Sequence, residues 1–170
     1  MAGIVSRLGL YIDVDEPVGP WRVGMTAGTL PVQSPRRGRM ALRIVLVDDD
    51  ESLAELLRVH FELDERFELV GSARNGLEGI RLVREDDPDA VLMDLQMPVL
   101  GGAAATRQIL EANPSACVIA FTASDDPSEH AAARRAGAAA VLAKPFDPEA
   151  FLDAFETHAR SCSRNRADAA

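Results

Sequence analysis

The sequence predicts an α/β fold with a five-stranded parallel sheet and helices on both of its faces. Five short apolar runs alternate with five helical segments between residues 41 and 160, and strict alternation is typical of a parallel sheet. The first run, residues 43–47, is apolar at every position after Arg43, which predicts a strand buried on both faces. Hydrophobic residues make up 47% of the chain and aromatic residues only 5%, so we expect an aliphatic core.

The remaining elements follow from apolar spacing and from residues that begin or end helices. Strands are expected at residues 43–47, 67–73, 88–93, 116–121 and 138–143. In the helix after the first strand, apolar residues recur at helical spacing from Leu53 to His60. Helices are then expected from Asn75 to about residue 85, at 103–112, from Asp126 to Gly137, and from Asp147 onward.

The charge distribution divides the chain into three parts. The net charge is −9, but residues 1–40 carry five arginines and three acids, whereas residues 41–160 carry eleven basic and twenty-three acidic residues. We therefore predict an extension at 1–40, a domain at 41–160 and a short tail at 161–170. The extension is rich in glycine and proline, so we expect it to be disordered, apart from a possible strand at 9–14, or to precede a true start at Met40. The acidic balance disfavours binding to nucleic acid or anionic membranes.

Several sequence features bear on the compartment. Cys117 and Cys162 form no CxxC motif, so we expect neither a disulfide framework nor a zinc site, and we expect a reducing cytoplasm. No apolar run reaches the ~20 residues that a membrane span requires. Acidic and basic residues interrupt the N-terminus, which disfavours a secretory signal.

Chemically active side chains fall at the ends of four predicted strands. They are Asp48 and Asp49, Asp94, Thr122 and Lys144. Because parallel sheets bind ligands beyond the carboxyl ends of their strands, these side chains are expected to converge. Clustered carboxylates need a cation, and Mg²⁺ suits hard oxygen ligands. A carboxylate among them could accept a phosphoryl group, and no GxxxxGK[ST] or GxGxxG loop indicates a nucleotide donor.

These residues give the chain a resemblance to the receiver domain of two-component response regulators, which has the flavodoxin-like (βα)5 fold. The matching motifs are Val47-Asp48-Asp49, Met93-Asp94-Leu95-Gln96-Met97-Pro98 with Gly102 beyond it, Phe121-Thr122-Ala123 and Lys144-Pro145-Phe146. The resemblance covers about 70% of the chain, from Leu42 to Arg160.

The resemblance implies a role for each site residue. Asp94 matches the phosphoacceptor, Lys144 the lysine that pairs with the phosphoryl oxygens, and Thr122 the hydroxyl that starts the switch. The implied Mg²⁺ ligands are Asp49 directly, Asp48 through water, Asp94, and the backbone carbonyl of Gln96. Val141 stands where the family commonly has an aromatic ring, which puts the usual hydroxyl–aromatic coupling in doubt.

The resemblance also implies partners. A sensor histidine kinase or a phosphotransfer protein would supply the phosphoryl group, and the protein would phosphorylate and dephosphorylate itself with Mg²⁺ rather than act as an enzyme on other substrates. We expect no DNA-binding domain after residue 160 and therefore expect the output through protein contact at residues 126–160. Alternatives are a haloacid-dehalogenase-type phosphatase that uses the Asp48-Asp49-Asp50 sequence, a phosphorelay intermediate, and a fragment of a longer regulator.

Overall fold

The computed structural model describes residues 4–5, 11–12, 41–144 and 147–168, within two units, Met1–Arg37 and Gly38–Ala170. In the first unit, β1 (Ile4–Val5) pairs antiparallel with β2 (Tyr11–Ile12), and β2 lies within the strand suggested at residues 9–14. The disorder expected for the rest of residues 1–40 concerns positions outside the described residues.

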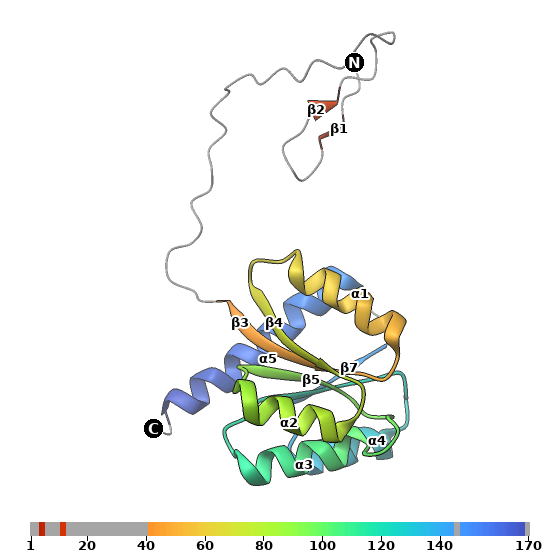
Figure 1. The fold of residues 1–170 in the computed structure, drawn as a ribbon, viewed down its shortest axis with the longest axis vertical. Helices are drawn as coiled ribbons and strands as arrows, with labels where there is room; N and C mark the ends of the chain where they lie inside the picture. The colour runs from red at the N-terminus through yellow and green to blue at the C-terminus, as the bar shows by residue number, and fades with distance from the viewer. Residues whose placement is uncertain (1–3, 6–10, 13–40, 145–146, 169–170) are drawn as a thin grey trace. The chain divides into compact units, whose positions relative to one another are not determined.

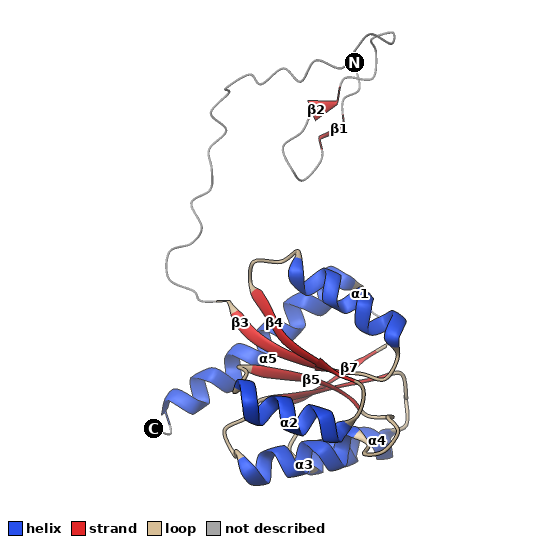
Figure 2. Ribbon diagram, viewed as in Figure 1, coloured by secondary structure: helices blue, strands red, loops and turns tan. Residues whose placement is uncertain are grey.

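The second unit contains a five-stranded sheet that alternates with helices along the chain (Figures 1 and 2). All pairings in this sheet are parallel, and the strand order is β4-β3-β5-β6-β7. This is the order of doubly wound sheets of the flavodoxin type, so the predicted fold is confirmed. The elements are β3 (Leu42–Val47), α1 (Glu51–Glu62), β4 (Phe67–Ala73), α2 (Gly76–Asp86), β5 (Ala90–Asp94), α3 (Gly102–Ala112), β6 (Val118–Thr122), α4 (Pro127–Arg135), β7 (Ala140–Ala143) and α5 (Pro148–Asp168).

Alternate residues of the strands pack on opposite faces of the sheet. Ile44 and Leu46 of β3 join the hydrophobic cluster beneath α1 and α5, whereas Val45 and Val47 join the cluster beneath α2 and α3. This is the period-two geometry of a strand, and it explains why 44–47 must be apolar throughout. Figure 1 shows the two helical layers on either side of the sheet.

The core beneath α1 and α5 is not purely aliphatic, contrary to the expectation from composition. Five phenylalanines gather there with ring centroids 5.1–6.3 Å apart in the contacting pairs; they are Phe61, Phe67, Phe121, Phe151 and Phe155. A low aromatic content does not exclude an aromatic core when most of the rings lie in one cluster.

Acidic and amide side chains begin the helices as predicted. Asp50 accepts hydrogen bonds from the backbone N–H groups of Ser52 and Leu53 at the start of α1. Asn75 accepts one from Glu78 at the start of α2, and Asp126 begins α4 in the same way. Helix α5 continues beyond residue 160 to Asp168, so it runs into the segment that was expected to be a tail.

An ion-pair network joins the turn before β4 to α5. The Arg66 guanidinium contacts the carboxylates of Asp64, Asp153 and Glu156 at 2.6–2.9 Å, and Arg160 contacts Glu156 at 2.6 Å. Burial raises the pKa of Glu156, but its hydrogen bonds to Arg160 and Arg66 outweigh burial and leave this pKa below its usual value.

The two cysteines are joined by a disulfide, so the expectation that they form no disulfide was wrong. Cys117 directly precedes β6 and Cys162 lies on α5, and their Cα atoms are 5.7 Å apart. They are 45 residues apart in the sequence, and the fold brings them together because α5 packs beside the beginning of β6.

Within the part of the chain that the structure describes, no helix is both long enough and apolar enough to cross a membrane.

Candidate functional site

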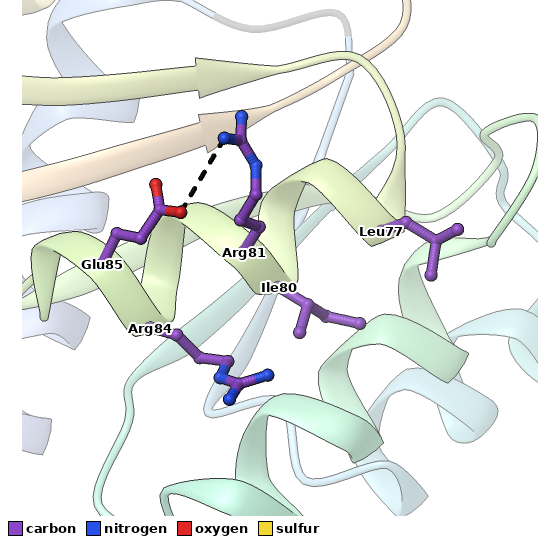
Figure 3. A pocket seen from close by; sticks show the side chains of 5 residues that line it. All are labelled: Leu77, Ile80, Arg81, Arg84 and Glu85. Atoms are coloured by element: carbon purple, nitrogen blue, oxygen red, sulfur yellow. Dashed lines mark ion pairs between the residues drawn. The ribbon is translucent and has the colours of Figure 1, made fainter.

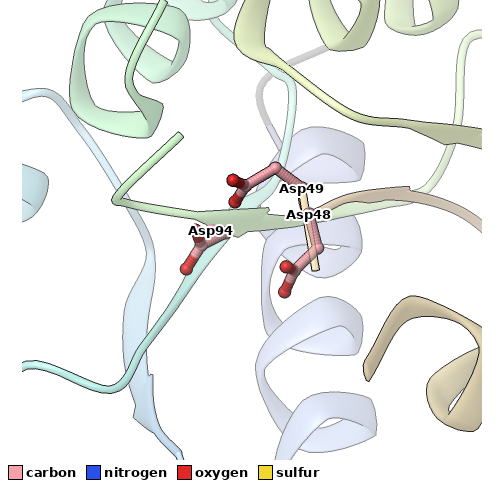
Figure 4. A group of neighbouring side chains, drawn as sticks. All are labelled: Asp48, Asp49 and Asp94. Atoms are coloured by element: carbon pink, nitrogen blue, oxygen red, sulfur yellow. The ribbon is translucent and has the colours of Figure 1, made fainter. Parts of the chain in front are cut away.

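The carboxyl ends of four neighbouring strands bring the predicted site residues to one edge of the sheet. Asp48 follows β3, Asp94 ends β5, Thr122 ends β6 and Lys144 follows β7. The backbone N–H of Asp48 donates to the carbonyl of Ala73, which fixes its position beyond the strand. Figure 4 shows Asp48, Asp49 and Asp94 grouped at the ends of adjacent strands.

Lys144 bridges two buried carboxylates. Its Nζ donates to Oδ2 of Asp48 at 2.7 Å and to Oδ1 of Asp94 at 3.0 Å. The side chains of Lys144, Asp48 and Asp94 are 14%, 1% and 7% exposed, so little solvent screens the two ion pairs. The ammonium also lies 4.8 Å from the centre of the Phe121 ring. Lys144 is the only lysine in the sequence, and the fold places it here.

The surroundings shift the pKa values of both partners. Burial raises the pKa of Asp94, and the opposing hydrogen bond from Lys144 offsets this only in part. Burial alone would lower the pKa of Lys144, but its hydrogen bonds to Asp48 and Asp94 raise it overall. Lys144 therefore stays charged beside a carboxyl group that burial disfavours as an anion.

The three aspartates form an oxygen-rich group that suits a hard cation. One carboxylate oxygen from each of Asp48, Asp49 and Asp94 lies within 4.8 Å of the others. Asp48 and Asp94 are buried, whereas Asp49 is exposed, so the group opens toward solvent on one side. Carboxylate oxygens with a solvent-facing side fit Mg²⁺, which prefers oxygen ligands and keeps several waters.

Gly102 lies directly against the backbone of Asp94. A Cβ atom on Gly102 would lie 1.9 Å from the carbonyl oxygen of Asp94, so only glycine fits there. In the same loop, Val99 has a φ of 68°, a left-handed conformation that is strained for a β-branched residue. The sequence analysis did not predict this close approach.

Thr122 is placed between the site and the loop that leads to α4. Its side chain is buried, and its hydroxyl accepts a hydrogen bond from the backbone N–H of Ser124 at 3.1 Å. Its carbonyl accepts one from the backbone N–H of Lys144 at 2.7 Å. The hydroxyl and the lysine are thus held on adjacent strands.

Gln96 contacts a residue that sequence reasoning missed. The side-chain amide donates to both carboxylate oxygens of Glu129, at 2.9 and 3.2 Å, which links the loop after Asp94 to the first turn of α4. These residues are 33 positions apart and belong to no common motif, so only the folded chain brings them together.

Two surface hollows lie away from this site. One, of about 440 Å³, is lined by five side chains of α2 (Figure 3). The other, of about 620 Å³, lies between the ends of α2 and α3. No aspartate of the oxygen-rich group lines either hollow.

The chain belongs to the response regulator receiver domain family, whose pattern matches residues 44–156. It is 38% identical over 115 residues to the chemotaxis protein CheY of Halobacterium salinarum, with 68% of this chain and 94% of that protein covered. It is 34% identical to the transcriptional regulatory protein YhcZ of Bacillus subtilis, covering 69% of this chain but only 55% of that longer protein. A LuxR-family response regulator from Aurantimonas sp. SI85-9A1 has a similar structure, with a TM-score of 0.68, 34% identity, and coverage of 71% of this chain and 86% of that one.

Family membership defines the general activity. The chain is a receiver domain, a phosphoaccepting signalling switch of two-component systems. The family match also decides against the phosphatase alternative, because that class belongs to a different family with its nucleophile on the first strand of the sheet. Receiver domains bind Mg²⁺ at an acidic pocket, and this chain carries a cluster of three aspartates at the corresponding edge.

Proposed function

We propose that Asp94 accepts the phosphoryl group, with Lys144 and Thr122 completing the site. The observation that supports this most strongly is the position of the Asp94 carboxylate, 3.0 Å from Lys144 Nζ and beside two further acids. The ammonium can pair with phosphoryl oxygens once they arrive, and the Thr122 hydroxyl lies on the next strand of the sheet.

The proposed metal ligands are Asp49, Asp48 through water, Asp94 and the backbone carbonyl of Gln96. Bound Mg²⁺ would offset the negative charge of the carboxylates and of the phosphoryl oxygens. This charge balance is needed because three acids face only one lysine at this edge.

In phosphoryl transfer, one bond to phosphorus forms and another breaks. An oxygen of the Asp94 carboxylate bonds to the phosphorus of a donor phosphohistidine on a sensor kinase or phosphotransfer protein. The bond between phosphorus and the histidine nitrogen breaks, and that nitrogen keeps the electron pair. Water later attacks the phosphorus of the acyl phosphate, the bond to the Asp94 oxygen breaks, and inorganic phosphate leaves as the carboxylate is regenerated. The protein would thereby catalyse its own phosphorylation and dephosphorylation.

The proposed output is a protein contact made by residues 126–160, which comprise α4, β7 and most of α5. The phosphorylated form would bind its target through this face, hereafter the output face, rather than through DNA. A phosphorelay role uses the same acceptor and differs only in passing the group on to another histidine.

The test is phosphoryl labelling of the full chain by acetyl phosphate or a sensor kinase, with and without Mg²⁺. We expect label on Asp94, loss of label in Asp94→Asn, and normal labelling in the control Asp125→Asn, because Asp125 is exposed and lies outside the cluster. Normal labelling of Asp94→Asn would contradict the assignment. Recovery of label on a histidine of a second protein would favour the relay role.

A further inference from the structure

The disulfide joins the two ends of the segment that carries the output face. Cys117 lies immediately before β6, and Cys162 lies on α5 two residues beyond Arg160. The enclosed chain therefore contains β6, α4, β7 and α5 up to residue 161, together with Thr122 and Lys144. A covalent bond at this position restrains the output face as one closed loop.

The two cysteines differ in their exposure to solvent. Cys117 is 2% exposed and belongs to the hydrophobic cluster beneath α1 and α5. Cys162 is partly exposed and packs against the same cluster. We therefore expect a small thiol or disulfide to react first at Cys162, and Cys117 to react with Cys162 inside the fold.

The positions of β6 and α5 suit a disulfide between them, and other contacts also hold α5. The Cα–Cα distance of 5.7 Å lies in the usual range for disulfides. Phe155 and Ala159 of α5 are buried in the cluster beneath α1 and α5. Because this packing does not depend on the disulfide, we expect α5 to stay on the sheet when the bond is reduced.

We propose that Cys117 and Cys162 form a reversible redox site that controls the freedom of the output face. Such a site requires a reducing compartment, in which the disulfides that do form are mostly transient and redox-sensing. The redox chemistry stands independently, whereas its consequence for signalling rests on the proposed function of residues 126–160.

The proposed oxidant is a low-molecular-weight disulfide such as oxidised glutathione. The Cys162 thiolate attacks one sulfur of the oxidant, its S–S bond breaks, and one thiol leaves. The Cys117 thiolate then attacks the sulfur of Cys162 and displaces the second thiol. Two protein thiols lose two electrons and two protons, one molecule of oxidant becomes two thiols, and the reverse sequence reduces the protein.

The first test measures the thiols of the full chain in glutathione buffers that span reducing to oxidising potentials. We expect maleimide labelling of the quenched and denatured chain to fall from two groups to none, with no disulfide between chains and a loss of two hydrogens in mass. Two reactive thiols at every potential, or a disulfide between two chains, would overturn the proposal. A disulfide that reduced glutathione never opens would show a permanent bond and overturn its reversibility.

The second test compares amide hydrogen exchange in the two redox states. Closing a loop of this length lowers the unfolding equilibrium constant on the order of 10²- to 10³-fold in the chain-entropy account, so reduction should speed exchange in α5 and at the start of β6. The variant Cys162→Ala should exchange like the reduced protein at every potential. Equal exchange in both states of the natural sequence would overturn the control of the output face.

Labelling of Asp94 by acetyl phosphate in the same samples separates the two proposals. Absence of label in both redox states would refute the proposed function while the thiol results stand on their own. Normal label together with redox-insensitive α5 exchange would refute only the redox proposal.

Discussion

Replacing Lys144 with methionine should lower the stability of the folded protein, because the site contains one ammonium between two buried carboxylates. The substitution keeps the length and apolar stem of the side chain but removes the ammonium that contacts Asp48 and Asp94. Removing one partner of a buried ion pair typically costs about 3–5 kcal/mol, because the remaining charge is left without compensation. The exposed fractions of the three side chains, 14% or less, place this site in that class.

Protonation limits this cost and makes it depend on pH. Burial already holds the pKa of Asp94 above its value in the unfolded chain, and loss of Lys144 raises it further. A carboxyl with a raised pKa binds its proton more tightly in the folded state, so stability falls as pH rises through that pKa. We therefore expect a deficit of about 3 kcal/mol near pH 8, or roughly 10 °C in melting temperature, that shrinks as the pH falls toward 5.

The assay is thermal and urea unfolding of Lys144→Met and the natural sequence at several pH values, with and without Mg²⁺. The control is Arg135→Met, which removes an exposed positive charge at the end of α4 and should cost little. Mg²⁺ should stabilise the lysine variant more than the natural sequence, since it restores positive charge among the acids. Equal stability of Lys144→Met and the natural sequence at pH 8 would refute the reasoning.

Three further substitutions test the surroundings of the site by urea unfolding. Gly102→Ala should destabilise the folded protein by about 2 kcal/mol or more, because the new Cβ would meet the carbonyl oxygen of Asp94. The control Gly101→Ala, whose Cβ would have its nearest contact at 3.3 Å, should cost much less. Equal costs for the two variants would contradict this reasoning. Val99→Asn should stabilise by about 1 kcal/mol, since asparagine tolerates the left-handed conformation, and a loss of stability would argue against strain. Glu156→Gln should lower the free energy of unfolding by about 1 kcal/mol at pH 7. Because the pKa of Glu156 is lowered in the folded state, its contribution to stability is present above the unfolded pKa and disappears as pH falls through the folded pKa. A cost that persisted at low pH would reject ion pairing as its cause.

The sequence predicts the site well where a residue's position at the end of a strand determines its place in the fold. Asp48, Asp94, Thr122 and Lys144 each follow or end a strand, and parallel strands bring their carboxyl ends to one edge. The convergence of these four side chains was therefore predictable from the sequence. Their proposed roles are those that the resemblance to receiver domains implies.

Contacts between elements that share no such rule were not predictable. The pairing of Cys117 with Cys162 depends on the angle at which α5 crosses the sheet, and no local pattern encodes this angle. The need for glycine at position 102 depends on a close approach to the Asp94 carbonyl within a loop. The gathering of phenylalanines depends on which helix faces meet, so composition alone gave the wrong expectation.

Two hydrogen bonds tie the Thr122 strand end to α4. The Thr122 hydroxyl accepts from the backbone N–H of Ser124, and the imidazole Nε2 of His130 lies 2.7 Å from the carbonyl oxygen of Ser124. In the proposed switch, movement of the hydroxyl toward a phosphoryl group would break the first contact and release the backbone that His130 contacts. We therefore expect the loop and the first turn of α4 to respond together.

The second connection to α4 starts in the loop after Asp94. Gln96, two residues after Asp94, donates to Glu129 in the first turn of α4. By contrast β7 carries Val141, which has no ring that could turn inward and report the change. Both connections end in the first turn of α4, and both consist of polar contacts. We therefore expect a change in charge at Asp94 to reach the proposed output face through hydrogen bonds rather than through repacking of an aromatic side chain.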